Sequence, residues 1–280
     1  MSDIRTVATR AAYGEALVEL GKQRDDFIVL DADLAAATQT GKFKKEFPDR
    51  FYDCGIAEQN LISIAAGVAA TGKKVFASSF AMFAAGRAFE QVRNSIGYPH
   101  LNVVIGATHA GISVGEDGAT HQCNEDIALM RSIPGMTVIN PADETEAKKA
   151  VKAAIDHDGP VYIRFGRLAT PVLFDDSYDF KIGKGVTLKD GSDVTIIATG
   201  LMVNEALLAY DILKEKGISA RVINIATIKP LDCELVLKAA KETGAIVTAE
   251  EHSVIGGLGG AVSELVCENC PVPVIKLGIN

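Results

Sequence analysis

The sequence has no excess of basic residues. Its 280 residues include 28 Lys and Arg against 36 Asp and Glu, which gives a formal net charge of −8 at pH 7. Nucleic acids and anionic membranes are bound mainly through clustered Lys and Arg, so this balance argues against either as the main partner. A few local basic side chains can still bind a small phosphorylated ligand.

The sequence also has few cysteines and no long apolar run. Among its five cysteines, only Cys267 and Cys270 have the spacing of a redox or zinc motif, and no second pair completes a zinc site. The odd number of thiols indicates a reducing compartment rather than a disulfide framework. No stretch reaches the ~18 apolar residues of a membrane span, and the N-terminus has no apolar signal segment. We therefore expect a soluble, cytoplasmic protein without a membrane partner.

Three common catalytic signatures are missing. The run GGLGGAVSE (256–264) has Val262 where a dinucleotide-binding fingerprint needs glycine. Neither a G-x-x-x-x-G-K-[ST] phosphate loop nor a G-x-S-x-G nucleophile elbow occurs. Simple hydride transfer, P-loop phosphoryl transfer and serine acyl chemistry all lose support.

What the sequence does contain is an alternation of short apolar strands and helices. Such a pattern is typical of parallel sheets covered by helices on both faces, so we expect an α/β protein of two doubly wound domains. The first domain is predicted over 1–170 and a smaller one over 190–280. The stretch 171–189 breaks the rhythm with Pro, Gly, Asp and aromatic residues and is predicted to be a linker.

Polar residues gather where predicted strands end, which is where open parallel sheets bind ligands. The densest group is THAGISVGEDGATHQ (108–122), a glycine-rich loop that carries His109, Asp117 and His121. This loop is compatible with three interpretations: a polar pocket wall, an ordinary surface loop, or a metal site formed by the two histidines and the aspartate.

Three stretches together carry a resemblance to a known family. DCGIAEQNLISIAAGVA, SSFAMFAAGRAFEQVRNSI and ATHAGISVGEDGATHQCNED resemble, in this order and spacing, the C-terminal half of transketolase, and more closely the small subunit of two-chain transketolases. The resemblance implies a parallel-sheet pyrimidine-binding domain followed by a transketolase C-terminal-type domain. It also implies reversible transfer of a two-carbon ketol unit from a ketose phosphate to an aldose phosphate, with thiamine diphosphate as cofactor.

The resemblance assigns four residues to the cofactor. Glu58 matches the glutamate that hydrogen-bonds N1′ of the aminopyrimidine ring and so is expected to be catalytic; in an apolar wall, desolvation can raise its pKa toward the working range. Phe80 and Phe83 match the aromatic residues that stack on the ring, although F-x-x-F alone is more often plain core. Asp33 matches an acidic position at the cofactor interface. A third aromatic is often found one turn later, where this chain has Gly86, so we expect either a thinner wall or one filled by Phe89.

The resemblance also assigns the sugar-binding residues. His109 matches a position that binds phosphate, Asp117 one that binds sugar hydroxyls, and His121 a catalytic histidine beside the reacting carbons. Arg10 and Arg167 match the phosphate-binding arginines, with Arg164 as a second candidate for the latter. A serine that often contacts the phosphate is replaced here by Ala37, with Thr38 beside it.

One absence predicts a partner. The family holds the diphosphate through a metal bound by a G-D-G motif and a later Asn, and this chain has no such motif. The resemblance therefore implies a larger N-terminal subunit that supplies the site for Mg²⁺ or Ca²⁺, no metal ligand in this chain, and an α₂β₂ assembly. The family's C-terminal domain usually continues beyond VPVIKLGIN, so we also expect a shortened end.

Four other interpretations remain. The nearest is a fragment of a 1-deoxy-D-xylulose-5-phosphate synthase, which also has IAEQ but lacks a histidine at the position of His109. A 2-oxoacid dehydrogenase β subunit shares the fold without the paired histidines. A non-catalytic binding protein and a metal hydrolase that uses the His–Asp loop are the remaining two.

Overall fold

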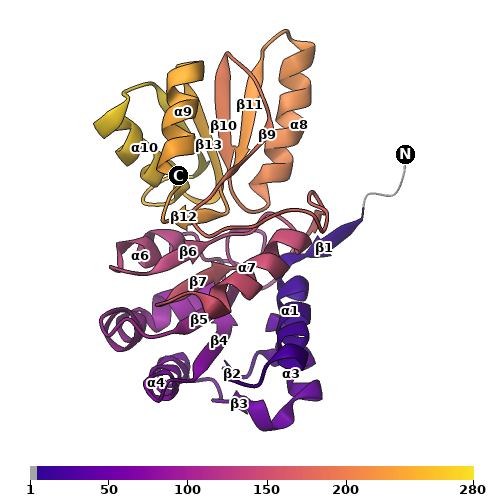
Figure 1. The fold of residues 1–280 in the computed structure, drawn as a ribbon, viewed down its shortest axis with the longest axis vertical. Helices are drawn as coiled ribbons and strands as arrows, with labels where there is room; N and C mark the ends of the chain where they lie inside the picture. Colours follow the sequence, from indigo (N-terminus) through magenta and orange to yellow (C-terminus); the bar gives the residue numbers. More distant parts are fainter. Residues whose placement is uncertain (1–4) are drawn as a thin grey trace.

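The computed structural model describes residues 5–280, which form two stacked α/β units (Figure 1). The elements up to residue 171 are β1 (Thr6–Ala8), α1 (Thr9–Gln23), β2 (Phe27–Asp31), α2 (Ala35–Thr38), α3 (Gly41–Glu46), the 3₁₀ turn η1 (Pro48–Arg50), β3 (Phe51–Asp53), α4 (Glu58–Ala69), β4 (Lys74–Phe80), the π-helical η2 (Met82–Arg87), α5 (Phe89–Gln91), the π-helical η3 (Val92–Gly97), β5 (Val103–Thr108), α6 (Asp126–Ser132), β6 (Thr137–Ile139), α7 (Glu144–Asp156), β7 (Val161–Arg164) and β8 (Ala169–Pro171). Those that follow are β9 (Val186–Lys189), β10 (Val194–Ala198), α8 (Met202–Glu215), β11 (Ala220–Asn224), β12 (Thr227–Lys229), α9 (Cys233–Thr243), β13 (Ile246–Ser253), α10 (Leu258–Asn269) and β14 (Val274–Ile279).

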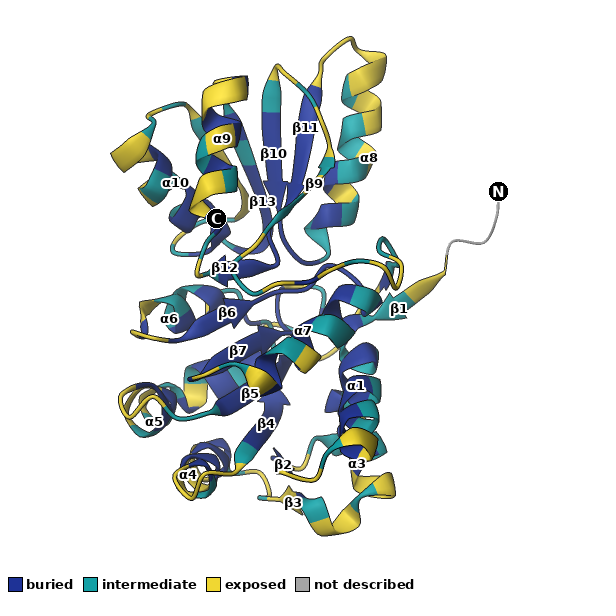
Figure 2. Cartoon of the chain, in the orientation of Figure 1, coloured by how far each residue is buried: buried dark blue, intermediate teal, exposed yellow. Residues whose placement is uncertain are grey.

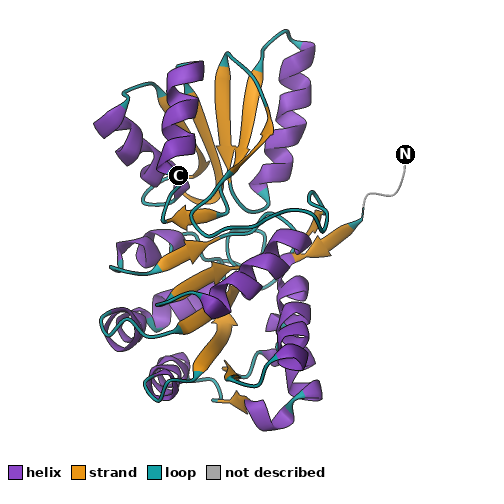
Figure 3. Cartoon of the chain, viewed as in Figure 1, coloured by secondary structure: helices purple, strands orange, loops and turns teal. Residues whose placement is uncertain are grey.

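The larger sheet has the strand order β12-β6-β7-β5-β4-β2-β3, and all its pairs except β12–β6 are parallel. Helices cover both of its faces (Figure 3). Every residue of β5 is buried, as expected for a strand that reads as one continuous apolar run. The predicted α/β class with mainly parallel sheets is confirmed.

The smaller sheet has the order β14-β13-β10-β11-β9, in which only β9 is antiparallel. β9 occupies the last four residues of the stretch that we expected to be a linker, and it pairs with β11. The short β8 ends at the first residue of the same stretch and pairs with β1. The division into 1–170, 171–189 and 190–280 stays a prediction, and its first four residues lie outside the described part of the chain.

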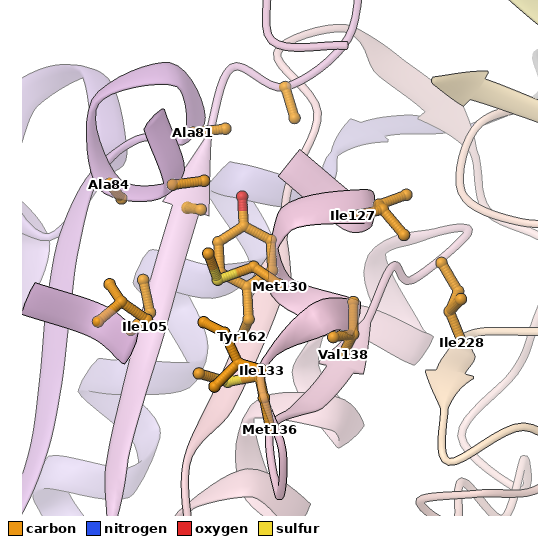
Figure 4. Packing of buried hydrophobic residues seen from close by; sticks show 14 of the residues in the cluster. Ala81, Ala84, Ile105, Ile127, Met130, Ile133, Met136, Val138, Tyr162 and Ile228 are labelled. Carbon is orange, nitrogen blue, oxygen red and sulfur yellow. The ribbon is translucent and has the colours of Figure 1, made fainter. Parts of the chain in front are cut away.

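One strand crosses between the units. β12 follows β11 of the smaller sheet but pairs with β6 at the edge of the larger one. Figure 4 shows its Ile228 near Val138 of β6, and both side chains are buried. Burial of one such side chain stabilises the fold by about 1.5–3 kcal/mol. The sequence pattern did not predict this strand, because three residues are too few to show a period.

The apolar core extends across both units. A single cluster of buried residues includes Leu61, Ile105 and Tyr162 of the larger sheet's unit together with Ile223 and Val262 of the smaller one. Figure 2 shows dark blue strands in both units with exposed residues on the outer sides of the helices. The two units therefore pack against each other through apolar contacts as well as through β12.

Within residues 5–280, no helix is both long and apolar enough to cross a membrane. Nor do three or more His, Cys, Asp or Glu side chains in this part of the chain lie together in a way that could hold a metal ion.

Candidate active site

Glu58 is the first residue of α4, and its side chain is only 2% exposed. Gly55, with φ of 70°, turns the chain just before the helix, a conformation that glycine adopts without strain. The expectation of a purely apolar wall is wrong, because Arg87 donates from Nη1 to both carboxylate oxygens of Glu58 at 2.9 Å. The Arg87 side chain is 50% exposed, so the pair lies at the edge of the core and one of its members faces outward.

Phe83 and Arg87 come from η2, which starts just after β4. In this π-helical turn the Ala88 N–H donates to the Phe83 carbonyl, five residues earlier. The Arg87 guanidinium lies 4.3 Å from the centre of the Phe83 ring, close enough for a cation–π contact. Sequence reasoning missed Arg87. The available signal was a lone cation one helical turn after Phe83 in the apolar run AMFAAGRAF.

The two phenylalanines lie side by side but have different surroundings. Their ring centres are 6.0 Å apart and the planes differ by 18°. Phe80 is buried against the His109 ring, whereas Phe83 is half-buried and keeps accessible area. Beside Gly86, the Met82 methyl group occupies the space that a Cβ would need. Phe89 instead packs against the main core.

His109 starts the glycine-rich loop and is buried, with φ of 59°. Its ring centre is 3.9 Å from that of Phe80, and its Nδ1 shares a hydrogen bond of 2.9 Å with the Thr108 hydroxyl. Burial, together with the positive charges of Arg10 and Arg167, lowers the pKa of His109 to about 4. The imidazole is therefore neutral at physiological pH.

The other predicted sugar-binding residues gather around His109. Asp117 and His121 act electrostatically on it, as the two arginines do. The His121 ring meets Phe83 edge-on at 5.2 Å, which links this group to the Glu58–Arg87 pair through a continuous set of contacts. Asp117 is exposed and His121 half-buried. The structure thus places Glu58 and Phe83 in one group with His109, His121 and the two arginines.

Arg164 and Arg167 have clearly different surroundings. Arg164 is buried, and its Nε donates to both carboxylate oxygens of Asp126 at 2.9 and 3.2 Å. Its Nη2 donates to the carbonyls of Cys123 and Glu251. Arg167 is half-buried and pairs only at the surface, with Glu116 at 3.1 Å. Arg164 is thus engaged inside the protein, which favours Arg167 as the ligand-binding arginine.

Arg10 is held by the segment after β2. Its Nη1 donates to the Ala37 carbonyl at 2.7 Å, so Ala37 contributes its backbone to the position of this arginine. Thr38 does not stand in for the missing serine, because it is buried and donates its hydroxyl hydrogen to Asp31 at 2.7 Å. Burial raises the pKa of Asp31 to about 6.

Asp33 lies apart from the group. It adopts φ of 61° in an exposed turn, and its backbone N–H donates to Asp53 at 3.0 Å. Within residues 5–280, no hydrogen bond or ring contact joins the Asp33 carboxylate to the side chains around Phe83. Its assignment to the cofactor stays a prediction.

Comparison with known protein families decides the relationship. The family model described as the transketolase pyrimidine binding domain matches residues 5–172, and that of the transketolase C-terminal domain matches 183–280. The chain belongs to the transketolase family. Its pyrimidine-binding domain implies thiamine diphosphate as the cofactor.

Individual relatives show which part of a transketolase this chain corresponds to. It is 54% identical to a protein of Methanocaldococcus jannaschii described as a transketolase C-terminal section, over 97% of this chain and 86% of that one. It is 46% identical to a subunit of 6-deoxy-6-sulfo-D-fructose transketolase from a Clostridium species, over 97% and 84% of the two chains. The predicted relationship is confirmed: the chain is the C-terminal section of a split transketolase, a subunit of a transferase, which implies a partner subunit.

A solved structure also supports the assignment to a split transketolase. A protein described as a split gene transketolase in an inactive β₄ tetramer superposes with a TM-score of 0.93 at 54% identity, over 99% of this chain and 90% of that one.

The side chains present fit the cofactor's ring. The half-buried Phe83 ring suits a flat heteroaromatic ring, and the buried Glu58 carboxylate suits a ring nitrogen. Both are tied to one guanidinium, so they lie at one place. The chain therefore has the groups that an aminopyrimidine needs, at the end of the larger sheet where such sheets bind ligands.

Proposed function

We propose that this chain is the small subunit of a two-chain transketolase, which transfers a two-carbon ketol unit reversibly from a ketose phosphate to an aldose phosphate. The observation that carries the proposal is the continuous group formed by Glu58, Arg87, Phe83, His121 and the buried His109. It joins a carboxylate and aromatic rings, which suit the cofactor, to the polar loop, which suits a sugar.

Thiamine diphosphate, when bound, supplies the carbon nucleophile and the electron sink that this transfer needs. Glu58 holds the proton shared with the ring nitrogen of the aminopyrimidine, and its burial shields that proton from water. Phe80 and Phe83 form the aromatic wall, in which Phe83 is the less buried of the two rings. Asp33, which lies in the exposed turn after β2 and apart from these rings, is assigned to the outer edge of the same cofactor site.

The sugar is bound by the residues around His109. Arg10 and Arg167 supply positive charge for the phosphate, because guanidinium groups present a donor fork that matches its oxygens. His109 is neutral here, so it contributes a hydrogen bond rather than charge. The exposed Asp117 accepts from sugar hydroxyls, and His121 donates to or accepts from the substrate oxygen next to the reacting carbons.

The partner completes the site. This chain has no G-D-G motif, so we assign the diphosphate and its Mg²⁺ or Ca²⁺ to a larger N-terminal subunit, in an α₂β₂ assembly. Two observations support this. The related structure of a split transketolase is described as an inactive tetramer of β chains alone. Further, Ile56 and Tyr52, which flank the turn before Glu58, are exposed apolar side chains that a second subunit could cover.

The test is reconstitution of the two-chain enzyme. The chain is co-expressed with the open reading frame beside its gene, and transfer from xylulose 5-phosphate to ribose 5-phosphate is measured with and without thiamine diphosphate. We expect cofactor-dependent transfer by the mixture and none by either chain alone. A sulfonated sugar donor is included, because the Clostridium relative is named for one and arginines bind sulfonate as they bind phosphate. Decarboxylation of pyruvate without ketol transfer would overturn the proposal in favour of the synthase or dehydrogenase class.

A further inference from the structure

One side chain of the smaller α/β unit contacts the glycine-rich loop of the larger unit. Glu251 lies near the end of β13, and its carboxylate accepts the Ser113 N–H at 2.7 Å, a contact between residues 138 positions apart. Glu251 is 8% exposed and so is shielded from water. A hydrogen bond from a backbone N–H to a shielded carboxylate is stronger than one between neutral groups.

The close approach depends on a glycine. Gly111 has φ of 83°, and a Cβ built there would lie 2.3 Å from the carboxyl carbon of Glu251. Its N–H donates to the Cys123 carbonyl at 2.8 Å and closes the loop at its base. The Glu251 carboxylate therefore packs directly against the stem from which the rest of the loop projects.

The far end of the loop is held from the same unit. The Ser253 N–H donates to the Asn124 carbonyl at 2.7 Å. Arg164 joins the two sides through its Nη2, which donates to the backbone carbonyls of both Cys123 and Glu251. Both ends of the segment that carries Asp117 and His121 are thus fixed by the last residues of β13.

We propose that Glu251 is a positioning residue, through which the smaller unit sets the geometry of the loop and hence of its sugar-binding side chains. The effect on sugar binding rests on the proposed function, whereas the effect on the loop does not. Asp117 is exposed, and His121 is half-buried with edge-on ring contacts to Phe80 and Phe83, so the stem contributes to fixing the place of both.

The first experiment measures amide hydrogen exchange of the full chain, which needs neither partner nor activity. Glu251→Ala removes the acceptor, Glu251→Met fills the space without one, and Glu251→Gln keeps an acceptor oxygen. We expect exchange over 111–123 to be roughly tenfold faster in the Ala and Met variants and near wild type in the Gln variant, since the loss of a bond to a charged group is worth about that factor. Glu242→Ala is the control, because it removes another carboxylate of this unit, which pairs with Arg221 at the opposite end of the sheet.

The second experiment measures kinetics in the reconstituted enzyme. We expect Glu251→Met to raise KM for the ketose phosphate about tenfold with kcat within about twofold, and Glu251→Gln to restore it. Loop exchange that is unchanged in the Met variant, or equally fast in the Gln variant, would overturn the positioning role. Faster exchange with unchanged KM would overturn its effect on the sugar. If the wild-type mixture transfers no ketol unit, the proposed function fails while the exchange result still decides whether Glu251 holds the loop.

Discussion

The carboxyl ends of the two sheets carry similar residues but use them differently. At the smaller sheet, Glu250 accepts the N–H groups of Leu258 and Gly259 at the start of α10, each at 2.7 Å. The buried His252 accepts from Ala128. At the larger sheet, several residues of the candidate site are only half-buried, among them Phe83, His121 and Arg167. The polar end of the smaller sheet is bonded internally, whereas that of the larger sheet keeps groups free to meet a ligand.

Two buried glutamates make the contrast concrete. Glu146 accepts from the Ala142 N–H, the Tyr178 hydroxyl and the Asn224 amide, so its three partners are fixed groups of the protein. Among the residues that the structure describes, Glu58 has one side-chain partner, Arg87, and that partner is half exposed to solvent. Burial of an acid alone therefore does not mark a site. The difference is whether its hydrogen bonds are all met by the protein's own fixed groups.

The most direct test of this difference between Glu58 and Glu146 is to neutralise each glutamate in turn. Glu58→Gln keeps the shape of the side chain but removes the group that can hold the ring-nitrogen proton. We expect the transfer rate of the reconstituted enzyme to fall at least ~100-fold, a typical contribution of acid–base catalysis. Circular dichroism and thermal unfolding should show an intact fold.

Glu146→Gln is the matched control for activity, and its transfer rate should stay near that of the wild type. If Glu58→Gln retained near-normal rates, or if both variants lost activity equally, the distinction between the two carboxylates would be wrong.

The second contrast lies between Arg164 and Arg167. Arg164→Met leaves the carboxylate of Asp126 buried without its cation, which typically costs about 3–5 kcal/mol in the free energy of unfolding. Arg167→Met breaks only a surface pair and should change stability by less than ~1 kcal/mol. It should instead raise KM for the ketose phosphate about tenfold, by loss of one charged contact.

Denaturant unfolding and steady-state kinetics of the two arginine variants check this prediction. An Arg167→Met enzyme with unchanged KM would show that the phosphate is bound elsewhere. An Arg164→Met chain as stable as the wild type would show that the buried pair contributes nothing to the fold.

Glu146 itself offers a test on stability. Burial raises its pKa from 4.5 to about 7, so the folded chain holds the proton more tightly than the unfolded chain. This effect favours the fold below pH ~4.5 and is lost as pH rises through about 7, so ionisation of Glu146 lowers stability at pH 8. Glu146→Gln should therefore be more stable than the wild type at pH 8, by up to about 3 kcal/mol, and similar at pH 4.5.

The geometry allows this substitution. The glutamine oxygen can accept from the Ala142 N–H, while its amide nitrogen donates to the Tyr178 oxygen and to Asn224. Within the described part of the chain, the Oδ1 of Asn224 is buried without a partner, so a flip of that amide provides the second acceptor. Denaturant unfolding at both pH values checks the sign. If Glu146→Gln were less stable than the wild type at both pH values, the fold would require the carboxyl group itself.

The sequence predicted the strands and helices that have a clear period. The helix α7 begins shortly after Pro141, where the Asp143 carboxylate accepts the Glu146 N–H. β9 and β12 were missed because each has at most four residues and gains its place only from tertiary pairing.

The site was only partly predictable for a similar reason. The resemblance named the residues that the fold gathers around His109, because their types and order are local features of the chain. Two contacts could not be read from it. Arg87 meets Glu58 across 29 positions through a π-helical turn, and Glu251 meets Ser113 across 138. Both depend on how separate elements pack, which no local pattern records.

The smallest expected effect concerns the charge of His109. Because burial and two nearby arginines hold its pKa at about 4, its ring should not titrate between pH 5.5 and 8. Proton NMR of the imidazole signals checks this, with His109→Asn to assign them. Inorganic sulfate keeps its charge over this range, so the pH dependence of sulfate affinity should be the same in the wild type and in His109→Asn. The variant should bind sulfate more weakly by about 1 kcal/mol, because it loses one hydrogen bond. A ring that titrated near pH 6.5 would mean that His109, like the exposed residues of its loop, faces water. The contrast between the buried His109 and its more exposed ligand-binding neighbours would then be lost.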